Sequence, residues 1–533
     1  MLVSLLLLAV VMFTCTAFHR LSNRLGVPAL LAFLFLGMLF GSDGLFKIPF
    51  EDYAFAHQVS TVALLFIMFY GGFGTNWRTA RPAAAPAILL SSLGTVLTAA
   101  LTGLFCHFVV GMPLLEGLLC GAVLGSTDAA SVFAILRARK LALKENTDSL
   151  LEVESGSNDP FAYMLTAVLL TAMESGITPG AVARLLGSQL VFGLAFGFGV
   201  GWAALWLLRR LRLDGSGFET IFVVATALFS YAAPAMLGGN GFLSVYITGI
   251  LLGNGRLRST ATLVSFFDGV TGIMQMVLFF LLGLLAFPSQ MPAVVLPAVG
   301  IMLFLTFAAR PAAVFLLLAP FRGSRRQKLL VSFAGLRGAA SIVFAVMTVI
   351  SPVSTDHDLF HIVFLIVLFS ISLQGSLLPL AARRLGMIDE GGNVLKTFTD
   401  YVDETPVQFI QFTVPDGHAW CGRAVRDLIL PPGSLLISLQ RGQEQIVPNG
   451  DTQLAAGDRL ILAALERETL PGVTLTEKEV TAQDLAAGAR LADLPRRADA
   501  LIVLVERGDS YLLPNGDTIL QAGDRLVINN TEG

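Results

Sequence analysis

The sequence predicts an all-α polytopic membrane domain of about 13 transmembrane helices, followed by a smaller cytoplasmic α+β region. The chain has 533 residues, of which 55% are apolar and only 14% charged, whereas ordinary soluble domains are about 25% charged. Apolar segments close to the ~20 residues needed to cross a bilayer recur as far as residue 385. Beyond that point the sequence changes to short alternating strands with Gly, Asp and Asn turns.

The apolar segments predict thirteen membrane spans. They lie at or near 1–18, 26–42, 58–73, 83–110, 113–136, 149–173, 180–208, 218–237, 241–253, 262–287, 291–319, 329–351 and 358–382. No basic residue precedes the first apolar run, so we expect a retained helix there and not a cleaved signal peptide.

Basic residues concentrate in alternate loops, beginning with the first, for example at Arg20, Arg209 and Arg383. The other loops carry mainly acidic residues or no charge. The positive-inside rule therefore predicts a multi-pass protein of the cell (inner) membrane, with its N-terminus outside and its C-terminal domain in the cytoplasm. A net charge of −3 gives no reason to expect nucleic acid as a partner, so the expected surroundings are the lipid bilayer.

Three polar stretches, 125–131, 152–160 and 335–341, lie inside predicted spans. At ~1.5 Å of rise per residue, Asp159 lies ~16 Å into its helix, and Asp128 and Arg337 lie ~12 Å into theirs. A charged side chain in the membrane interior costs at least roughly 2.5–3.5 kcal/mol and by default indicates an ion or proton pathway. These depths exceed the reach of a side chain that snorkels to the interface.

Residues 125–135 resemble residues 335–345, and the two stretches occupy matching positions in two six-span blocks, spans 1–6 and 8–13. The predicted topology runs them through the membrane in opposite directions. This pattern is typical of an inverted repeat, in which interrupted helices, here spans 5 and 12, indicate the binding site. Chance similarity between two Gly/Ala-rich membrane helices is the alternative.

Spacing assigns roles within span 6. Ser155 and Asp159 share one helix face, as do Glu154 and Asn158. Pro160 has no amide hydrogen, so the helix is expected to open locally beside Asp159. Oxygen-rich surroundings suit a hard monovalent cation, and a single carboxylate can bind a proton instead. Competition of cation and proton for Asp159, in a protein that alternates its access, is antiport.

Arg337 needs a buried counter-charge, and Glu154 is the candidate, since it lies on a different helix face from Asp159.

At these residues the chain resembles the monovalent cation:proton antiporter-1 family, NhaP type, over residues 1–385. The resemblance is carried by Asn158-Asp159-Pro160, Thr127-Asp128 and Gly335-Leu336-Arg337-Gly338. One departure is Ala129, where many relatives have proline after the aspartate of span 5.

The resemblance implies a homodimer in which a core domain moves against a dimerisation domain. It implies that Asp159 is the ligand of the monovalent cation and the site of the proton. The implied cation/proton-binding set is Asp159, Asp128, Thr127, Ser155 and Asn158. Glu154 and Arg337 would form a structural ion pair, with Asn158 bonded near it. An Asn-Asp pair in place of Asp-Asp is associated in such proteins with electroneutral exchange.

The region after residue 385 is predicted to comprise a linker, 386–404, and two small units, 405–468 and 469–533. The units are predicted from an internal repeat. Residues 435–442, 448–452 and 457–460 return as 501–508, 514–518 and 523–526. Asn-Gly and Gly-Asp pairs at the ends of apolar runs indicate hairpin turns.

The two units resemble the RCK C-terminal (TrkA-C) domain, a regulatory module of potassium channels and transporters. The resemblance implies regulation by the tail, with a small cytoplasmic ligand or nucleotide at this region. No Gly-rich dinucleotide fingerprint precedes them, so the N-terminal half of such a module is not expected. A dimer-stabilising cap without a ligand is the alternative.

The leading hypothesis is a secondary antiporter that exchanges a cytoplasmic monovalent cation for protons in cation and pH homeostasis. K⁺ is favoured over Na⁺ on the strength of the RCK-C-like tail alone. A cation channel and a membrane-anchored ligand sensor are the alternatives. No enzyme is expected, because no nucleophile with a base can be assembled from the sequence. No cofactor is expected, and the four cysteines show neither metal-ligand nor disulfide spacing.

Overall fold

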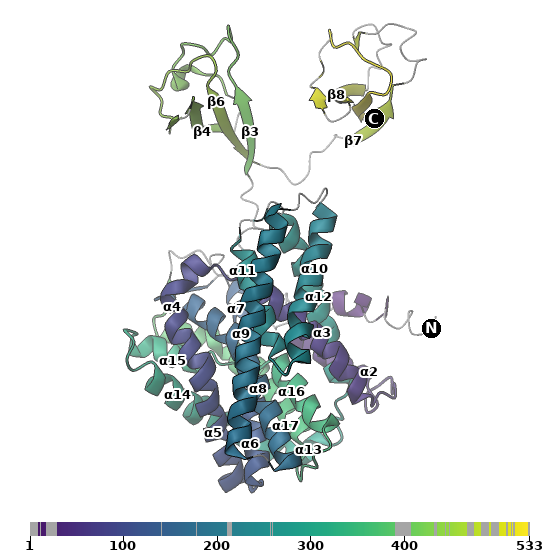
Figure 1. Cartoon of the computed structure of the whole chain (residues 1–533), viewed down its shortest axis with the longest axis vertical. Helices are drawn as coiled ribbons and strands as arrows, with labels where there is room; N and C mark the ends of the chain where they lie inside the picture. The colour runs from purple at the N-terminus through teal and green to yellow at the C-terminus, as the bar shows by residue number, and fades with distance from the viewer. Residues whose placement is uncertain are drawn as a thin grey trace. The chain divides into compact units, whose positions relative to one another are not determined.

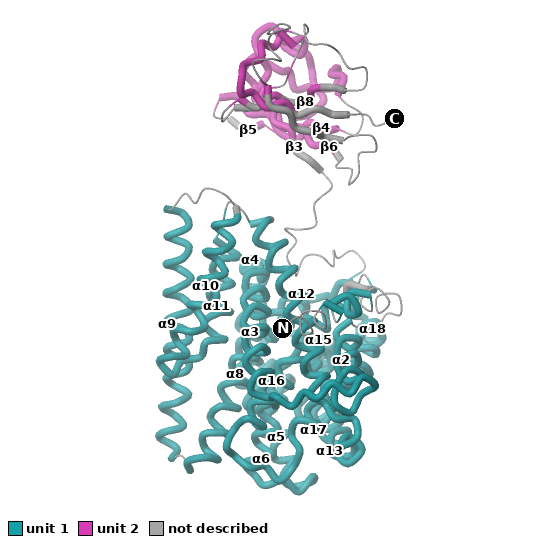
Figure 2. Tube along the Cα trace, turned by 90° about the vertical axis from the view of Figure 1, so that its right-hand side faces the viewer, with its two compact units in different colours: residues 1–403 teal, residues 404–533 magenta. Residues whose placement is uncertain are grey.

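Figure 1 shows the protein as a computed structural model. The structure describes residues 9–10, 12–17, 29–139, 141–176, 178–210, 216–255, 257, 260–389, 407–430, 434–442, 444–446, 448–465, 474–480, 490–491, 500–507, 510–512, 514 and 517–530. The chain forms two compact units, Met1–Asp403 and Glu404–Gly533 (Figure 2). Most of the predicted linker 386–404 and part of the first predicted span 1–18 lie outside the described residues.

The first unit is helical apart from one two-stranded sheet among its described residues. The elements of its first half are α2 (Ala29–Phe40), α3 (Tyr53–Gly74), α4 (Trp77–Leu89), η1 (Leu90–Gly94), α5 (Thr95–Phe105), η2 (Cys106–Val110), α6 (Leu114–Val123), α7 (Ala129–Ala138), β1 (Ala142–Leu143), α8 (Thr147–Ser175) and α9 (Pro179–Arg210). Those of its second half are α10 (Ser216–Met236), α11 (Gly241–Gly253), α12 (Thr260–Leu284), α13 (Met291–Phe304), η3 (Leu305–Ala309), α14 (Arg310–Leu317), α15 (Arg325–Phe333), α16 (Ala339–Ile350), α17 (Leu359–Phe369), η4 (Ser370–Gln374), α18 (Gly375–Arg384) and β2 (Ile388–Asp389).

Seven helices among the described residues are long and apolar enough to cross a membrane. Three of them combine several elements without a break, namely Trp77–Val110, Met291–Leu317 and Leu359–Arg384. Four further apolar helices are shorter, at Ala29–Phe40, Leu114–Val123, Gly241–Gly253 and Ala339–Ile350. The predicted helical membrane domain is confirmed, whereas the count of thirteen spans stays a prediction.

Two of the predicted spans are interrupted where the glycine-rich stretches indicated. Helix α6 ends at Val123 and α7 begins at Ala129, and α15 ends at Phe333 while α16 begins at Ala339. Helix α8 runs unbroken through Pro160, and the Asn240 side chain donates a hydrogen bond to the Pro160 carbonyl oxygen at 2.8 Å. The two interruptions therefore bring non-helical backbone into the interior of the domain, and α8 brings polar side chains there. Non-helical backbone at membrane depth is tolerated only where protein or a cavity surrounds it.

Close packing of glycines positions α11 against α3. A Cβ atom at Gly72 would lie 2.3 Å from the Tyr246 carbonyl oxygen, and one at Gly249 would lie 2.3 Å from the Phe69 carbonyl oxygen. Only glycine permits this backbone approach, which is typical of membrane helices. Tyr246 is thereby held in the interior of the domain, with 4% of its surface exposed.

The strand pair β1–β2 places the start of α8 beside the end of α18. Ala142 pairs with Asp389 and Leu143 with Ile388. The start of α8 and the end of α18 therefore lie on the same side of the domain, the side from which the chain continues to residue 404 and beyond.

Among its described residues, the second unit contains two four-stranded antiparallel sheets. The first, in the order β3-β6-β4-β5, consists of β3 (Val407–Thr413), β6 (Arg459–Leu465), β4 (Ser434–Arg441) and β5 (Glu444–Ile446), with a short 3-10 turn η6 (Val425–Asp427). The second, in the order β7-β10-β8-β9, consists of β7 (Thr474–Glu479), β10 (Arg525–Asn530), β8 (Ala500–Arg507) and β9 (Ser510–Leu512). The shared strand order matches the internal repeat predicted from the sequence.

Candidate functional site

The two helix interruptions contact each other. The Asp128 amide donates to the Leu336 carbonyl oxygen at 2.8 Å, and the Arg337 Nη1 donates to the carbonyl oxygens of Ser126, at 2.9 Å, and Leu124. A Cβ atom at Gly338 would lie 2.5 Å from Asp128 Oδ2, so only glycine allows this approach. Residues far apart in the sequence are thus joined by one backbone–backbone hydrogen bond and by bonds from the Arg337 side chain to backbone carbonyl oxygens. Their position at mid-depth of a membrane stays a prediction.

The charges of Asp128 and Arg337 match the helix ends beside them. Arg337 binds carbonyl oxygens at the C-terminal end of α6, where the helix dipole is negative. Asp128 accepts hydrogen bonds from the Ser131 amide, at 3.1 Å, and from the Ser131 hydroxyl, in the first turn of α7. A carboxylate is stabilised at a helix N-terminus and a cation at a C-terminus. Both residues therefore stabilise the interrupted helix ends in addition to any role in transport.

Helix α8 docks on the first interruption through the residues predicted from its spacing. The Ser155 hydroxyl donates to the Thr127 carbonyl oxygen at 2.7 Å and accepts from the Ala129 amide at 2.9 Å. The Asn158 Nδ2 donates to the Thr127 hydroxyl. These bonds satisfy backbone groups that the interruption leaves without helical partners.

Asp159 accepts a hydrogen bond from the Ser126 hydroxyl, a residue that was not in the predicted set. Its signal was present in the sequence, since Ser126 belongs to the same polar stretch as Asp128. The structure thus brings together all five residues of the predicted cation/proton-binding set.

A cavity of about 550 Å³ opens beside Asp159. Its wall includes four members of the predicted set, Thr127, Asp128, Ser155 and Asp159, together with Ser126. Along α8 the lining runs from Glu152 to Asp159, so the cavity lies on the side of Asp159 where α8 begins. This is also the side on which the β1–β2 pair lies.

The donor atoms around Asp159 are oxygens. Besides the carboxylate, they include the hydroxyl groups of Ser126 and Ser155, both on the cavity wall. Hard cations take such ligands. No group of three or more His, Cys, Asp or Glu side chains that could hold a metal ion occurs among the described residues. The oxygen atoms around Asp159 are thus of the type that binds hard cations.

The predicted ion pair between Glu154 and Arg337 is corrected by the structure. Glu154 pairs with Arg310, at the start of α14, and both side chains are buried. The physical reason is that the carbonyl oxygens at the end of α6 already provide partners for Arg337. Arg310 was missed, although an arginine in the middle of the apolar segment 291–319 is a clear signal of a buried partner.

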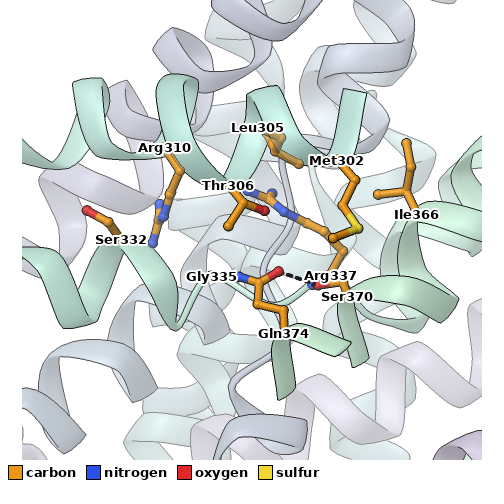
Figure 3. Close-up of a pocket in the computed structure, with 10 residues that line it drawn as sticks. All are labelled: Met302, Leu305, Thr306, Arg310, Ser332, Gly335, Arg337, Ile366, Ser370 and Gln374. Atoms are coloured by element: carbon orange, nitrogen blue, oxygen red, sulfur yellow. Dashed lines mark hydrogen bonds between the residues drawn. The ribbon is translucent and has the colours of Figure 1, made fainter. Parts of the chain in front are cut away.

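The two arginines line one closed polar pocket (Figure 3). There the Arg337 amide donates to the Ser370 hydroxyl at 3.0 Å, and that hydroxyl donates to Gln374 Oε1 at 2.9 Å. The Gln374 Nε2 in turn donates to the Phe333 carbonyl oxygen at 2.7 Å, at the end of α15. This network links the second interruption to the end of α15 and to η4.

Comparisons with known proteins agree with this geometry. The profile of the family described as "Sodium/hydrogen exchanger, transmembrane" matches residues 8–384, and that of the TrkA-C domain matches residues 409–468 and 475–528. The K(+)/H(+) antiporter NhaP2 of Shewanella baltica is 35% identical over 454 residues, which are 84% of this chain and 78% of that protein. The K(+)/H(+) antiporter NhaP of Alkalimonas amylolytica is 32% identical over 511 residues, or 95% of this chain and 89% of that protein.

A solved structure shares the fold of the first unit. It is that of the sodium proton antiporter MjNhaP1 from Methanocaldococcus jannaschii at pH 8, with a TM-score of 0.64 and 21% sequence identity. The match covers 72% of this chain and 99% of that one. With the family profile spanning both helix interruptions and α8, the chain belongs to the sodium/hydrogen exchanger family and is a multi-pass membrane protein with two C-terminal TrkA-C domains.

Proposed function

We propose that this protein exchanges a cytoplasmic monovalent cation for protons, with Asp159 as the carboxylate that binds each in turn. The observation that carries the proposal is the place of Asp159. It lies on the wall of a cavity of about 550 Å³, beside two crossing helix interruptions and next to the hydroxyl of Ser126. A carboxylate in this position can exchange a proton for a cation without rearranging its own helix.

The surroundings of Asp159 favour a one-for-one exchange. Asp128 is held by Ser131 at the start of α7, and the residue before Asp159 is the neutral Asn158, bonded to Thr127. Of the two aspartates, Asp159 is therefore the one whose charge changes during the transport cycle. One proton replaces one cation, so the cycle moves no net charge.

K⁺ is the favoured cation and Na⁺ the alternative. The support for K⁺ is that relatives at 32% and 35% identity are named K(+)/H(+) antiporters and that the tail consists of TrkA-C domains. The support for Na⁺ is the family description and the name of the protein with the matching fold. Residues on the cavity wall do not distinguish the two ions.

The proposal also covers the orientation of the protein in the membrane, its assembly and its regulation. Lys144, whose Nζ donates to the Gly386 carbonyl oxygen at 3.3 Å, belongs with Arg383 and Arg384 to the basic side of the domain. By the positive-inside rule we infer that this side, and with it the cavity, faces the cytoplasm from a cell (inner) membrane, with the N-terminus outside. We further propose a homodimer whose TrkA-C domains bind a small cytoplasmic ligand or nucleotide that regulates exchange in cation and pH homeostasis.

The test is cation-driven dissipation of a pH gradient in everted membrane vesicles, run separately with K⁺, Na⁺ and Li⁺. We expect K⁺ to dissipate the gradient through the unaltered protein and Asp159→Asn to abolish the response to every cation. Glu51→Gln, a change of an exposed carboxylate outside the cavity, is the control for expression and insertion.

Retained cation flux in Asp159→Asn would favour a channel, because a channel needs no titrating carboxylate. Absence of any cation response in the unaltered protein, at normal expression, would favour a membrane-anchored sensor. Either outcome would refute the proposed antiport.

A further inference from the structure

The cavity continues beyond Asp159 between two helices that face it with polar side chains at helical spacing. On α8 the lining residues include Glu152, Gly156 and Asp159, and on α12 they include Asp268 and Gln275. Residues three, four or seven apart share one face of a helix. Asp268 is exposed, whereas Glu152 is only 7% exposed. A cation that enters past Asp268 therefore meets a more enclosed section of the cavity before it reaches Asp159.

Tyr246 of α11 reaches into this enclosed section and packs on Gly156. A Cβ atom at Gly156 would lie 2.5 Å from the Tyr246 ring and 2.6 Å from its hydroxyl oxygen. Glycine at this position is therefore what lets the phenol lie directly against α8. Residues four apart on a helix have Cβ atoms about 5–6 Å apart, so the hydroxyl lies within side-chain reach of Glu152, and Asp159 follows Gly156 by three residues.

The Tyr246 hydroxyl is buried and forms no hydrogen bond of normal geometry among the residues that the structure describes, although the Thr75 side chain lies near it. A buried polar group without a partner is rare and calls for a ligand, a water or an ion to complete it. Tyr246 also lines the cavity that contains Asp159, the proposed site of exchange. Its neutral oxygen, within side-chain reach of Glu152, is the kind of ligand that can replace a water molecule of a hydrated monovalent cation.

We propose that Tyr246 and Glu152 form a second cation station, on the cytoplasmic side of Asp159, where the ion exchanges part of its water for protein oxygens. This inference rests on the proposed antiport function. The cation binds first at the station and then moves along α8 to displace the proton from Asp159. Tyr246 and Glu152 thus set the apparent affinity for the cation, and Asp159 carries the exchange itself.

The test measures the K⁺ concentration that gives half-maximal exchange, and the maximal rate, for the full-length protein in everted vesicles. Tyr246→Phe keeps the ring on Gly156 and removes only the hydroxyl. We expect it to raise the half-maximal concentration about 3–10-fold, as the loss of one neutral ligand contact would. The maximal rate should stay within about two-fold of the unaltered protein, because Asp159 is intact.

Two further variants test the same station. Glu152→Gln should raise the half-maximal concentration more than Tyr246→Phe, and the double variant should be less than additive, because both groups bind the same ion. Gly156→Ala, which displaces the phenol, should reproduce the effect of Tyr246→Phe. Tyr231→Phe is the matched control, because that tyrosine lines a different cavity with His57 and Phe242.

An unchanged half-maximal concentration in Tyr246→Phe would overturn the station. So would a shift of the pH profile alone, which would assign the hydroxyl to proton transfer. Loss of maximal rate with an unchanged half-maximal concentration would assign it a structural role and also overturn the station. Asp159→Asn distinguishes failure of the station from failure of the proposed antiport. That variant abolishes exchange if antiport is correct, whether or not Tyr246 binds the cation.

Discussion

Two of the carboxylates of helix α8, Asp159 and Glu154, lie five residues apart in opposite surroundings. Asp159 lies on the wall of a cavity of about 550 Å³ and contacts a hydroxyl. Glu154 is 1% exposed and pairs with Arg310, which lines a pocket with no volume for a water molecule. The difference shows what separates exchange from structure in this domain. A carboxylate that changes partners needs space around it, whereas one that holds helices together has its space filled and its charge matched.

The largest effect on stability is expected when one partner of the buried Glu154–Arg310 ion pair is replaced. Arg310→Met leaves the Glu154 carboxylate buried without its counter-charge, so we expect the free energy of unfolding to fall by about 3–5 kcal/mol. Thermal unfolding of the purified protein in detergent measures the loss. Arg322→Met, at an exposed position between α14 and α15, is the control. If Arg310→Met matched this control, Glu154 would not depend on Arg310.

Removing both charges of the pair should cost less than removing one. In Glu154→Gln/Arg310→Met both charges of the pair are removed together, while Arg337 keeps its carbonyl partners, and replacing a buried ion pair by neutral groups is often close to neutral. We therefore expect the double variant to recover most of the stability lost in Arg310→Met, measured by the same thermal unfolding. A double variant as unstable as Arg310→Met would show that packing of the side chains, and not the charge, stabilises this face of α8.

For a residue on the cavity face of α8, we expect a smaller loss of stability than in Arg310→Met but a clear loss of exchange activity. Ser155→Ala removes two hydrogen bonds between α8 and the first interruption. At about 0.5–1.5 kcal/mol for each bond, the cost is below that of Arg310→Met. Exchange in vesicles should nevertheless weaken, because Thr127 and Ala129 are then no longer fixed beside Asp159. Unaltered exchange at reduced stability would place Ser155 in the structural group with Glu154.

The contrast between the two faces also explains what the sequence could predict. Glycines and charged residues at equal depth were sufficient to predict both helix interruptions, because these features act on the local backbone. The partner of Glu154 was predicted wrongly because the Glu154 carboxylate and the guanidinium groups of Arg310 and Arg337 all meet in this region. Packing alone decides which of the two arginines forms the ion pair. Tyr246 could not be found from sequence either, since its role depends on the close approach of α11 to Gly156.

The smallest effect is expected for an arginine–carboxylate pair of the TrkA-C domains. Arg441 donates to Asp458 at 2.8 and 2.7 Å, and these bonds hold the pKa of Asp458 below its usual value. The folded-state pKa is therefore lower than the unfolded value of ~3.9. The pair contributes stability above that unfolded value and loses it as the pH falls through the folded-state pKa.

Arg441→Met should accordingly lower the protection of β4 and β6 amides at pH 7, measured by hydrogen exchange of the full-length protein, and the difference from the unaltered protein should shrink below about pH 4. The loss should be smaller than in Arg310→Met, because the Arg441 side chain is 45% exposed and water screens its charge. Asp458, itself 1% exposed, also keeps the hydrogen bond from the Ala455 amide when Arg441 is replaced. Gln440→Met, on the same strand, is the control for the change of side chain. Equal losses in Arg441→Met and Arg310→Met would mean that burial does not set the strength of these pairs, and the contrast drawn for α8 would fail with it.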